Sequence, residues 1–147
     1  MSGNSRLAVA AHALAWLGLN QRLGNELSTS DEVAGSVNTN PVVIRRLLGE
    51  LRDAGLVETR RGAGAGWRLA RDLGEITLLD VHDALVPTPL FGLHRATPNQ
   101  ECPVGYGIRP VMSRVFDDVD EVVRQRLART TLVDVLTEVL AAKGESG

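Results

Sequence analysis

The side chains with the clearest chemistry are two pairs of arginines between Asn38 and Ala70. Arg45 and Arg46 lie in a segment with helical spacing, and Arg60 and Arg61 directly precede three glycines at alternate positions. A guanidinium donates paired hydrogen bonds to a phosphate or to a guanine edge. A glycine-rich backbone can approach a ligand closely. The pattern predicts binding of a polyanion.

The net charge of −2 conceals a strong asymmetry along the chain. Residues 41–71 contain seven arginines and three acidic residues, a local charge of +4, whereas the remaining residues sum to −6. A basic segment of this kind is typical of a nucleic-acid-binding surface. The alternative is that adjacent arginines only form a solvated helix face, and the presence of both pairs in one segment argues against it.

The first arginine pair is predicted to lie on a helix that begins at Pro41. Asn40 is a favourable N-cap, proline is favourable at the first position, and Gly55 is a favourable stop. A shorter helix is expected to start just before, from Thr29 or Ser30. The later helix has an apolar stripe at helical spacing, formed by Ile44, Leu47, Leu48 and Leu51.

The second arginine pair is predicted to lie on the loop of a β-hairpin. Two short strands, 56–59 and 67–70, flank a loop built on Gly62, Gly64 and Gly66. The alternative is a nucleotide-binding glycine loop, but that loop needs a helix directly after it, and the strand-like WRLA follows here. We therefore predict a mainly α fold with a small β-hairpin, a winged helix-turn-helix.

In such a fold the N-terminal part of the second helix enters the major groove. The DNA-facing positions are those that lie off the buried stripe, together with the cations of the hairpin. We expect DNA contacts from Thr39, Asn40, Val42, Arg45, Arg46, Arg60, Arg61 and Arg68.

The C-terminal half is predicted to be helical around a connector. A helix over 78–86 completes a DNA-binding domain of residues 1–86, and residues 87–107, with four of the six prolines, form the connector. Residues 108–147 form a helical dimerisation region. Its long helix has apolar residues at nearly 3.5-residue spacing, which is typical of a helix that pairs with another. The predicted interface residues are Ile108, Val111, Met112, Val115, Val119, Val122 and Val123.

Cys102 is the only cysteine, so no internal disulfide forms, and a reducing compartment is expected. A thiol close to a helix N-terminus is favoured as the reactive thiolate, while the adjacent Glu101 opposes this. The alternative is a small buried residue.

No catalytic or metal-binding residues are predicted. The three histidines lack the spacing of a helical zinc site, and no nucleophile motif is present, so an enzyme is disfavoured. No apolar run reaches the roughly 20 residues that span a bilayer, and no cleavable leader is apparent. We expect a cytoplasmic protein.

Over almost its full length the chain resembles the bacterial winged-helix regulators of the IscR/NsrR/CymR group, the Rrf2 family. The resemblance rests on SRLAVAAHALAWL, SVNTNPVVIRRLLGELRDAGLVETRRGAGAGWRLA and EITLLDVHDALV. The segment ATPNQECPVG is most similar to the YwnA-type branch.

The resemblance implies a homodimer in which the long helix crosses its counterpart and each wing pairs with half of a palindromic DNA site. Many members hold an iron–sulfur cluster through three connector cysteines. This chain keeps only Cys102, so no cofactor is expected; the alternative is a cluster shared across the dimer. We expect a dimeric transcriptional repressor, with Cys102 as a candidate redox sensor. The alternative is a winged helix that docks a partner protein, against which Arg45 and Arg46 argue.

Overall fold

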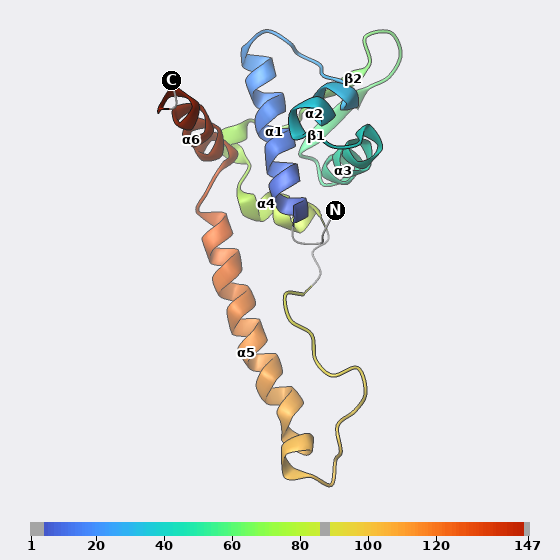
Figure 1. Ribbon diagram of the computed structural model, residues 1–147, viewed down its shortest axis with the longest axis vertical. Helices are drawn as coiled ribbons and strands as arrows, with labels where there is room; N and C mark the ends of the chain where they lie inside the picture. Colours follow the sequence, from blue (N-terminus) through green and yellow to red (C-terminus); the bar gives the residue numbers. More distant parts are fainter. Residues whose placement is uncertain (1–4, 86–88, 146–147) are drawn as a thin grey trace. The chain divides into compact units, whose positions relative to one another are not determined.

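The computed structural model describes residues 5–85 and 89–145. Its elements, shown in Figure 1, are α1 (Arg6–Arg22), α2 (Ser30–Val37), α3 (Pro41–Asp53), β1 (Val57–Arg60), β2 (Gly66–Leu69), the short 3-10 turn η2 (Leu73–Glu75), α4 (Leu78–Ala84), α5 (Pro103–Ala128) and α6 (Leu132–Glu145). The strands pair antiparallel, so the predicted mainly α fold with one hairpin is confirmed. The chain divides into a first unit, residues 1–87 with 128–147, and a second unit, residues 88–127.

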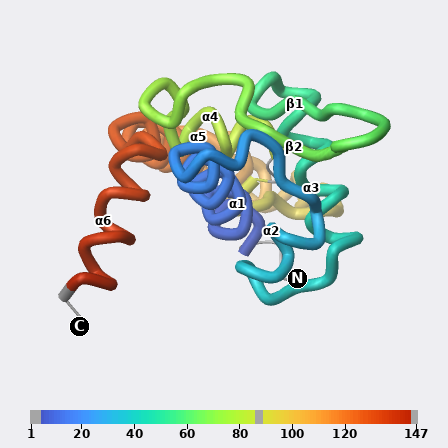
Figure 2. Tube along the Cα trace, turned by 90° about the horizontal axis from the view of Figure 1, so that it is seen from above, coloured from blue at the N-terminus to red at the C-terminus, as the bar shows by residue number. Residues whose placement is uncertain are grey.

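The first unit is built around α1. In Figures 1 and 2, α2 and α3 lie on one side of α1 and α6 lies on the other. Alanines and leucines dominate the buried face of α1, and Leu14 and Leu17 are fully enclosed. They pack in one core with the predicted stripe of α3, which is buried as expected.

Helix α6 is joined to the start of α4 by backbone hydrogen bonds. The amide of Leu78 donates to the carbonyl of Thr130 at 2.9 Å, and the amide of Leu132 donates to Ile76 at 2.9 Å. Leu132 is fully buried. The C-terminal helix is therefore part of the same core as the helix-turn-helix.

Two helix boundaries differ from the sequence prediction. The apolar helical pattern of residues 6–19 falls three residues short: α1 continues to Arg22 and ends inside the glycine-containing polar segment 18–24, and the side chain of Leu73 packs directly on Gly18. The predicted start of the long helix at Ile108 is wrong. Helix α5 begins at Pro103, since proline needs no hydrogen bond for its nitrogen in the first turn.

Smaller differences concern the strands and the fourth helix. Each strand is displaced by one residue from the prediction, with Arg60 opposite Gly66 at the loop end. The fourth helix ends at Ala84, and the predicted helical residue Val86 and connector residue Pro87 lie outside the described residues.

The second unit consists of the connector and α5. The connector lies along the helix: the rings of Phe91 and Phe116 stack with centroids 5.2 Å apart, and Arg109 donates a hydrogen bond to the carbonyl of His94. No residue of α5 is fully buried. Across the described ranges, no helix has both the length and the apolar character needed to cross a membrane.

Candidate nucleic-acid interface

Helix α3 presents one polar face because its opposite face is locked into the core. The four stripe residues are at most 2% exposed. At the N-terminus, Asn40 Oδ1 accepts a hydrogen bond from the amide of Val42 at 2.8 Å, so the predicted cap is confirmed. Val42 is 52% exposed, and Arg45 and Arg46 are exposed as well. The first two turns of α3 are therefore open to a ligand.

The turn between α2 and α3 fixes how α3 projects. Thr29 caps α2 and exchanges hydrogen bonds with Glu32, which selects Thr29 over Ser30 as the N-cap. Asn38 ends α2 in the left-handed conformation (φ 62°), which asparagine tolerates better than most residues. Thr39 and Asn40 follow it on the exposed turn.

The hairpin is anchored at its base. Ser28 and Trp67 exchange backbone hydrogen bonds of 2.7 and 3.0 Å, and the indole nitrogen of Trp67 donates to Ser30 Oγ at 3.0 Å. A Cβ on Gly66 would lie 2.9 Å from the carbonyl oxygen of Ser28, so glycine is required at this contact.

The loop of the hairpin is built for a tight turn. Gly62 and Gly64 have φ angles of 91° and 74°, which other residues adopt only with strain. Arg60 and Arg61 are exposed at the start of this loop, which projects from the unit in Figures 1 and 2. The predicted wing is thus present with its two cations at the exposed end.

The seven arginines of residues 41–71 separate into two groups. Three are engaged within the chain: Arg52 with Asp53 and the ring of Trp67, Arg68 with two carboxylates, and Arg71 with Asp80 and a carbonyl. The other four have no hydrogen-bond or ion-pair partner among the described residues. They are Arg45, Arg46, Arg60 and Arg61.

Arg68 differs in its surroundings from the other predicted DNA contacts. Its guanidinium binds Glu58 at 2.6 Å and Glu26 at 2.7 Å. The hydrogen bond and charge of Glu58, followed by Glu26, raise the pKa of Arg68. Arg68 thus joins both strands to the segment that precedes α2, and its charge is already compensated.

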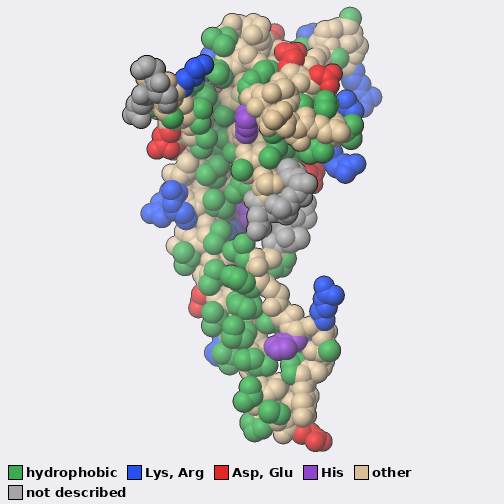
Figure 3. All heavy atoms as spheres, viewed as in Figure 1, with side chains coloured by type: hydrophobic (Ala, Val, Ile, Leu, Met, Phe, Trp, Pro, Cys, Tyr) green, Lys and Arg blue, Asp and Glu red, His purple; other side chains and the backbone are tan. Residues whose placement is uncertain are grey.

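A cleft of about 380 Å³ lies between the hairpin and the start of α2. Thr29 and Ser30 line it on one side, and Thr59, Arg60 and Arg61 on the other. Blue cationic spheres gather beside α3 and the hairpin in Figure 3. In the sequence, Thr29 and Ser30 are recognisable only as possible helix caps. A helix N-terminus that faces a basic loop is a favourable place for a phosphate.

Cys102 lies at the start of α5 and is exposed, so the alternative of a small buried residue is wrong. The backbone amides of Gly105 and then Val104 donate to its sulfur and lower the pKa of the Cys102 thiol. Among the described residues, no histidine, cysteine or carboxylate cluster suits a metal ion. His12 is exposed, with its Nε2 2.8 Å from Ser36 Oγ.

The predicted dimerisation residues lie on α5 with their side chains incompletely covered. Val111 and Val115 are each 46% exposed and Val122 is 65% exposed. Ile108, Met112, Val119 and Val123 are half-buried. Val104 and Tyr106, which belong to the connector in the sequence prediction, also lie on α5 and are each 70% exposed.

These features agree with the relatives of the chain. The family model described as "Iron-dependent Transcriptional regulator" (Rrf2) matches residues 4–138. YwnA of Bacillus subtilis (strain 168), named as an HTH-type transcriptional regulator, is 36% identical over 137 residues, covering 92% of this chain and 98% of YwnA. The HTH-type transcriptional regulator IscR of Cereibacter sphaeroides is 29% identical over 136 residues, covering 92% of this chain and 86% of IscR.

A crystal structure of a protein described as DNA-binding is similar to this fold with a TM-score of 0.71 and 34% identity, covering 90% of this chain and 99% of the other. The resemblance inferred from the sequence is therefore confirmed. The chain belongs to the Rrf2 family of transcriptional regulators, which are DNA-binding proteins and not enzymes.

Proposed function

We propose that the chain is a homodimeric, sequence-specific repressor that binds a palindromic operator through α3 and the hairpin. The observation that carries this proposal is the group of four exposed guanidiniums without partners within the described chain, at Arg45, Arg46, Arg60 and Arg61. They lie on two elements that are both fixed to α2, so their spacing is set before DNA binds. A module that only docks a protein has no need of four free cations.

The two arginine pairs have different proposed roles. Arg45 and Arg46, on the exposed face of α3, can donate a bidentate hydrogen bond to guanine, and Val42 can contact a thymine methyl group. Arg60 and Arg61 contact the sugar-phosphate backbone or the minor groove. In this proposal α3 recognises the bases, and the hairpin binds the sugar-phosphate backbone.

The proposed dimer is supported by two incompletely covered apolar surfaces. One is the seam of α5. The other is a mainly apolar groove of about 800 Å³ between α1 and α6 in the first unit, where Val139 and Leu140 are 55% and 42% exposed. Pairing with a second copy removes such surfaces from water. Twofold symmetry then matches a palindromic operator.

Cys102 is proposed as the redox-responsive residue. Its exposure and lowered thiol pKa favour the thiolate. With hydrogen peroxide, the thiolate sulfur attacks one peroxide oxygen, an S–O bond forms, the O–O bond breaks, and the other oxygen leaves as hydroxide, which takes a proton from solvent to give water. The cysteine is oxidised by two electrons to a sulfenic acid.

The residues of this chain do not fit an iron–sulfur cluster. Such clusters are held by several cysteine thiolates, with histidine as an occasional replacement. The chain contains one cysteine. The proposed function therefore does not require an iron–sulfur cluster.

The proposal is tested by fluorescence anisotropy with labelled DNA from upstream of the chain's own gene. We expect much tighter binding to this fragment than to a scrambled one, and loss of that preference in Arg45→Ala/Arg46→Ala. Arg95→Ala/Arg129→Ala, with two exposed arginines outside the interface, is the charge-matched control. Equal affinity for both fragments would contradict sequence-specific binding.

Two further experiments test repression and the redox role of Cys102. Transcription from the operator should rise when the gene is deleted, and a fall would show activation instead of repression. Peroxide treatment should change operator affinity in the unmodified protein and leave Cys102→Ser unchanged. Equal binding by oxidised, reduced and Cys102→Ser protein would dispose of the sensor role.

A further inference from the structure

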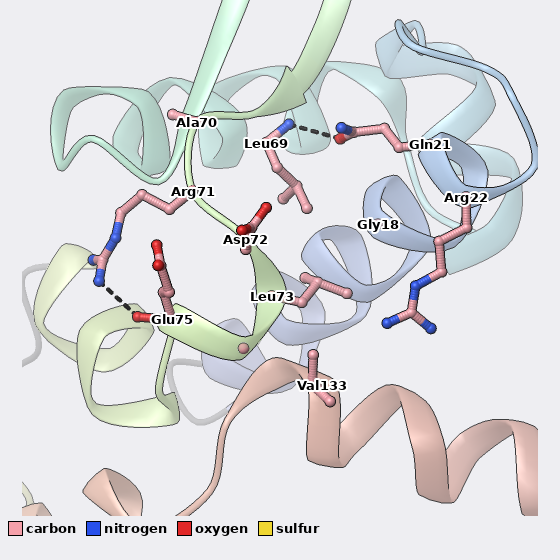
Figure 4. Close-up of a pocket in the computed structure, with 11 residues that line it drawn as sticks. Gly18, Gln21, Arg22, Leu69, Ala70, Arg71, Asp72, Leu73, Glu75 and Val133 are labelled. Carbon is pink, nitrogen blue, oxygen red and sulfur yellow. Dashed lines mark hydrogen bonds between the residues drawn. The ribbon is translucent and has the colours of Figure 1, made fainter.

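A polar pocket of about 540 Å³ lies outside the proposed DNA interface, within the first unit. Figure 4 shows its walls: the last turn of α1, the end of β2, residues 70–75 and Val133 at the start of α6. Three separate segments of the chain, residues 18–22, residues 69–75 and Val133, therefore meet at one cavity. Its volume lies within the range of small-molecule sites.

The pocket is held open by packing that needs no ligand. Leu73 is 5% exposed, and a Cβ on Gly18 would lie 2.3 Å from its Cδ1, so the turn fits directly against α1. On the opposite wall, Gln21 Oε1 accepts a hydrogen bond from the amide of Leu69 at 2.9 Å. This bond ties the end of α1 to β2.

The charged groups in the pocket do not neutralise one another. Arg22, Asp72 and Glu75 have side chains without a hydrogen-bond or ion-pair partner in the described part of the chain. Arg71 is engaged, because it donates to the carbonyl of Glu75 at 2.6 Å and lies 3.9 Å from Asp80. The three unpartnered groups are all solvent-exposed, so one positive and two negative charges are available to a charged ligand.

We propose that this pocket binds a free basic α-amino acid. Such a ligand carries one carboxylate and two cationic groups, the complement of the unmatched charges. In Figure 4, Asp72 lies between Arg22 on one side and Glu75 on the other. Arg22 holds the ligand carboxylate, Asp72 the α-ammonium group and Glu75 the side-chain cation.

Other ligand classes match fewer of these groups. A diamine leaves Arg22 without a partner, and a dicarboxylate places a second negative charge near Asp72 and Glu75. A neutral amino acid leaves Glu75 unmatched. These mismatches make the specificity measurable with simple compounds.

Isothermal titration calorimetry on the full-length protein without DNA tests the proposal, so its outcome is independent of the proposed operator binding. We expect saturable binding of L-lysine and L-arginine with one ligand per chain. L-Norleucine, which lacks the side-chain ammonium group, and cadaverine, which lacks the carboxylate, should each bind about tenfold more weakly or worse, because each loses charge-assisted hydrogen bonds. Absence of saturable lysine binding, or equal binding of cadaverine, overturns the proposal.

Substitutions in the pocket test which residue contacts which group of the ligand. Arg22→Gln and Asp72→Asn should each weaken lysine binding by about tenfold or more, whereas Arg129→Gln and Asp117→Asn, outside the pocket, should not. Glu75→Gln should abolish the preference for lysine over norleucine while norleucine affinity stays the same, which an unfolded variant could not show. Circular dichroism checks that each variant is folded. Unchanged lysine affinity in both Arg22→Gln and Asp72→Asn overturns the assignment.

Discussion

The indole nitrogen of Trp67 donates a hydrogen bond to Ser30 Oγ at 3.0 Å, and both residues are buried. Trp67 belongs to the second strand of the hairpin and Ser30 is the first residue of α2. This bond therefore fixes the hairpin to the helix-turn-helix and sets where its arginines lie relative to α3.

Removing either partner should destabilise the first unit. Ser30→Ala leaves a buried indole N–H unsatisfied and should lower the free energy of unfolding by about 1–3 kcal/mol. Trp67→Phe with Ser30→Ala should cost less than the two single changes added together, since the shared bond is lost once. Urea unfolding followed by circular dichroism measures the three values, and full additivity would show that the bond contributes nothing.

The wing arginines should control how DNA affinity depends on salt. Each phosphate contact that is lost reduces the slope of log K against log salt by about 0.9. Arg60→Ala/Arg61→Ala should therefore weaken binding to all sequences and flatten this slope. Anisotropy titrations between low and moderate salt provide the measurement, with Arg95→Ala/Arg129→Ala as the matched control. An unchanged slope would remove the hairpin from the interface.

Arg68 should behave differently from Arg60 and Arg61. Its charge is compensated by Glu58 and Glu26, so Arg68→Gln should leave the salt slope unchanged. The exposed ion pairs contribute little, so only a small loss of stability is expected. Glu26→Gln should produce a similar small loss. A flatter slope in Arg68→Gln would instead support the direct DNA contact expected from the sequence.

The sequence predicts the helix-turn-helix well because local signals and burial agree there. Asn40, Pro41 and Gly55 mark the ends of α3 by their own conformational preferences, and the apolar stripe selects the buried face. The end of α1 could not be read in this way. The segment 18–24 offers several possible helix ends, and α1 continues past Gly18, on which Leu73 packs, to Arg22.

Only part of the candidate interface can be predicted from the sequence. The arginines are visible in the sequence, but their separation into free and engaged groups depends on partners distant along the chain. Glu26 is 42 residues from Arg68, and Ser30 is 37 residues from Trp67. The polar pocket combines residues 18–22, 69–75 and 133, which no local pattern connects.

The reactivity of Cys102 should extend to lower pH than that of an ordinary thiol. Hydrogen bonds from the amides of Gly105 and Val104 favour the thiolate and lower the pKa of Cys102. The alkylation rate with iodoacetamide should therefore reach half its plateau at a lower pH in the native protein than in urea. The related stabilisation is present above the unfolded-state pKa and is lost as pH falls through the folded-state pKa. Coincident midpoints would show that the helix start does not activate the thiol.

The seam of α5 should determine the oligomeric state. Val115 is 46% exposed in the single chain, so Val115→Asp adds a solvated charge to a monomer but buries that charge in a dimer that uses this seam. Sedimentation velocity should show dissociation at protein concentrations about tenfold higher or more than for the unmodified protein. Gln125→Asp, an exposed change on the same helix outside the predicted seam, should leave the dimer intact. Circular dichroism should be unchanged in both variants, because no residue of α5 is fully buried in the single chain. If both variants sediment alike, the seam is not the contact between the two copies, and only the groove between α1 and α6 is left as the proposed dimer surface.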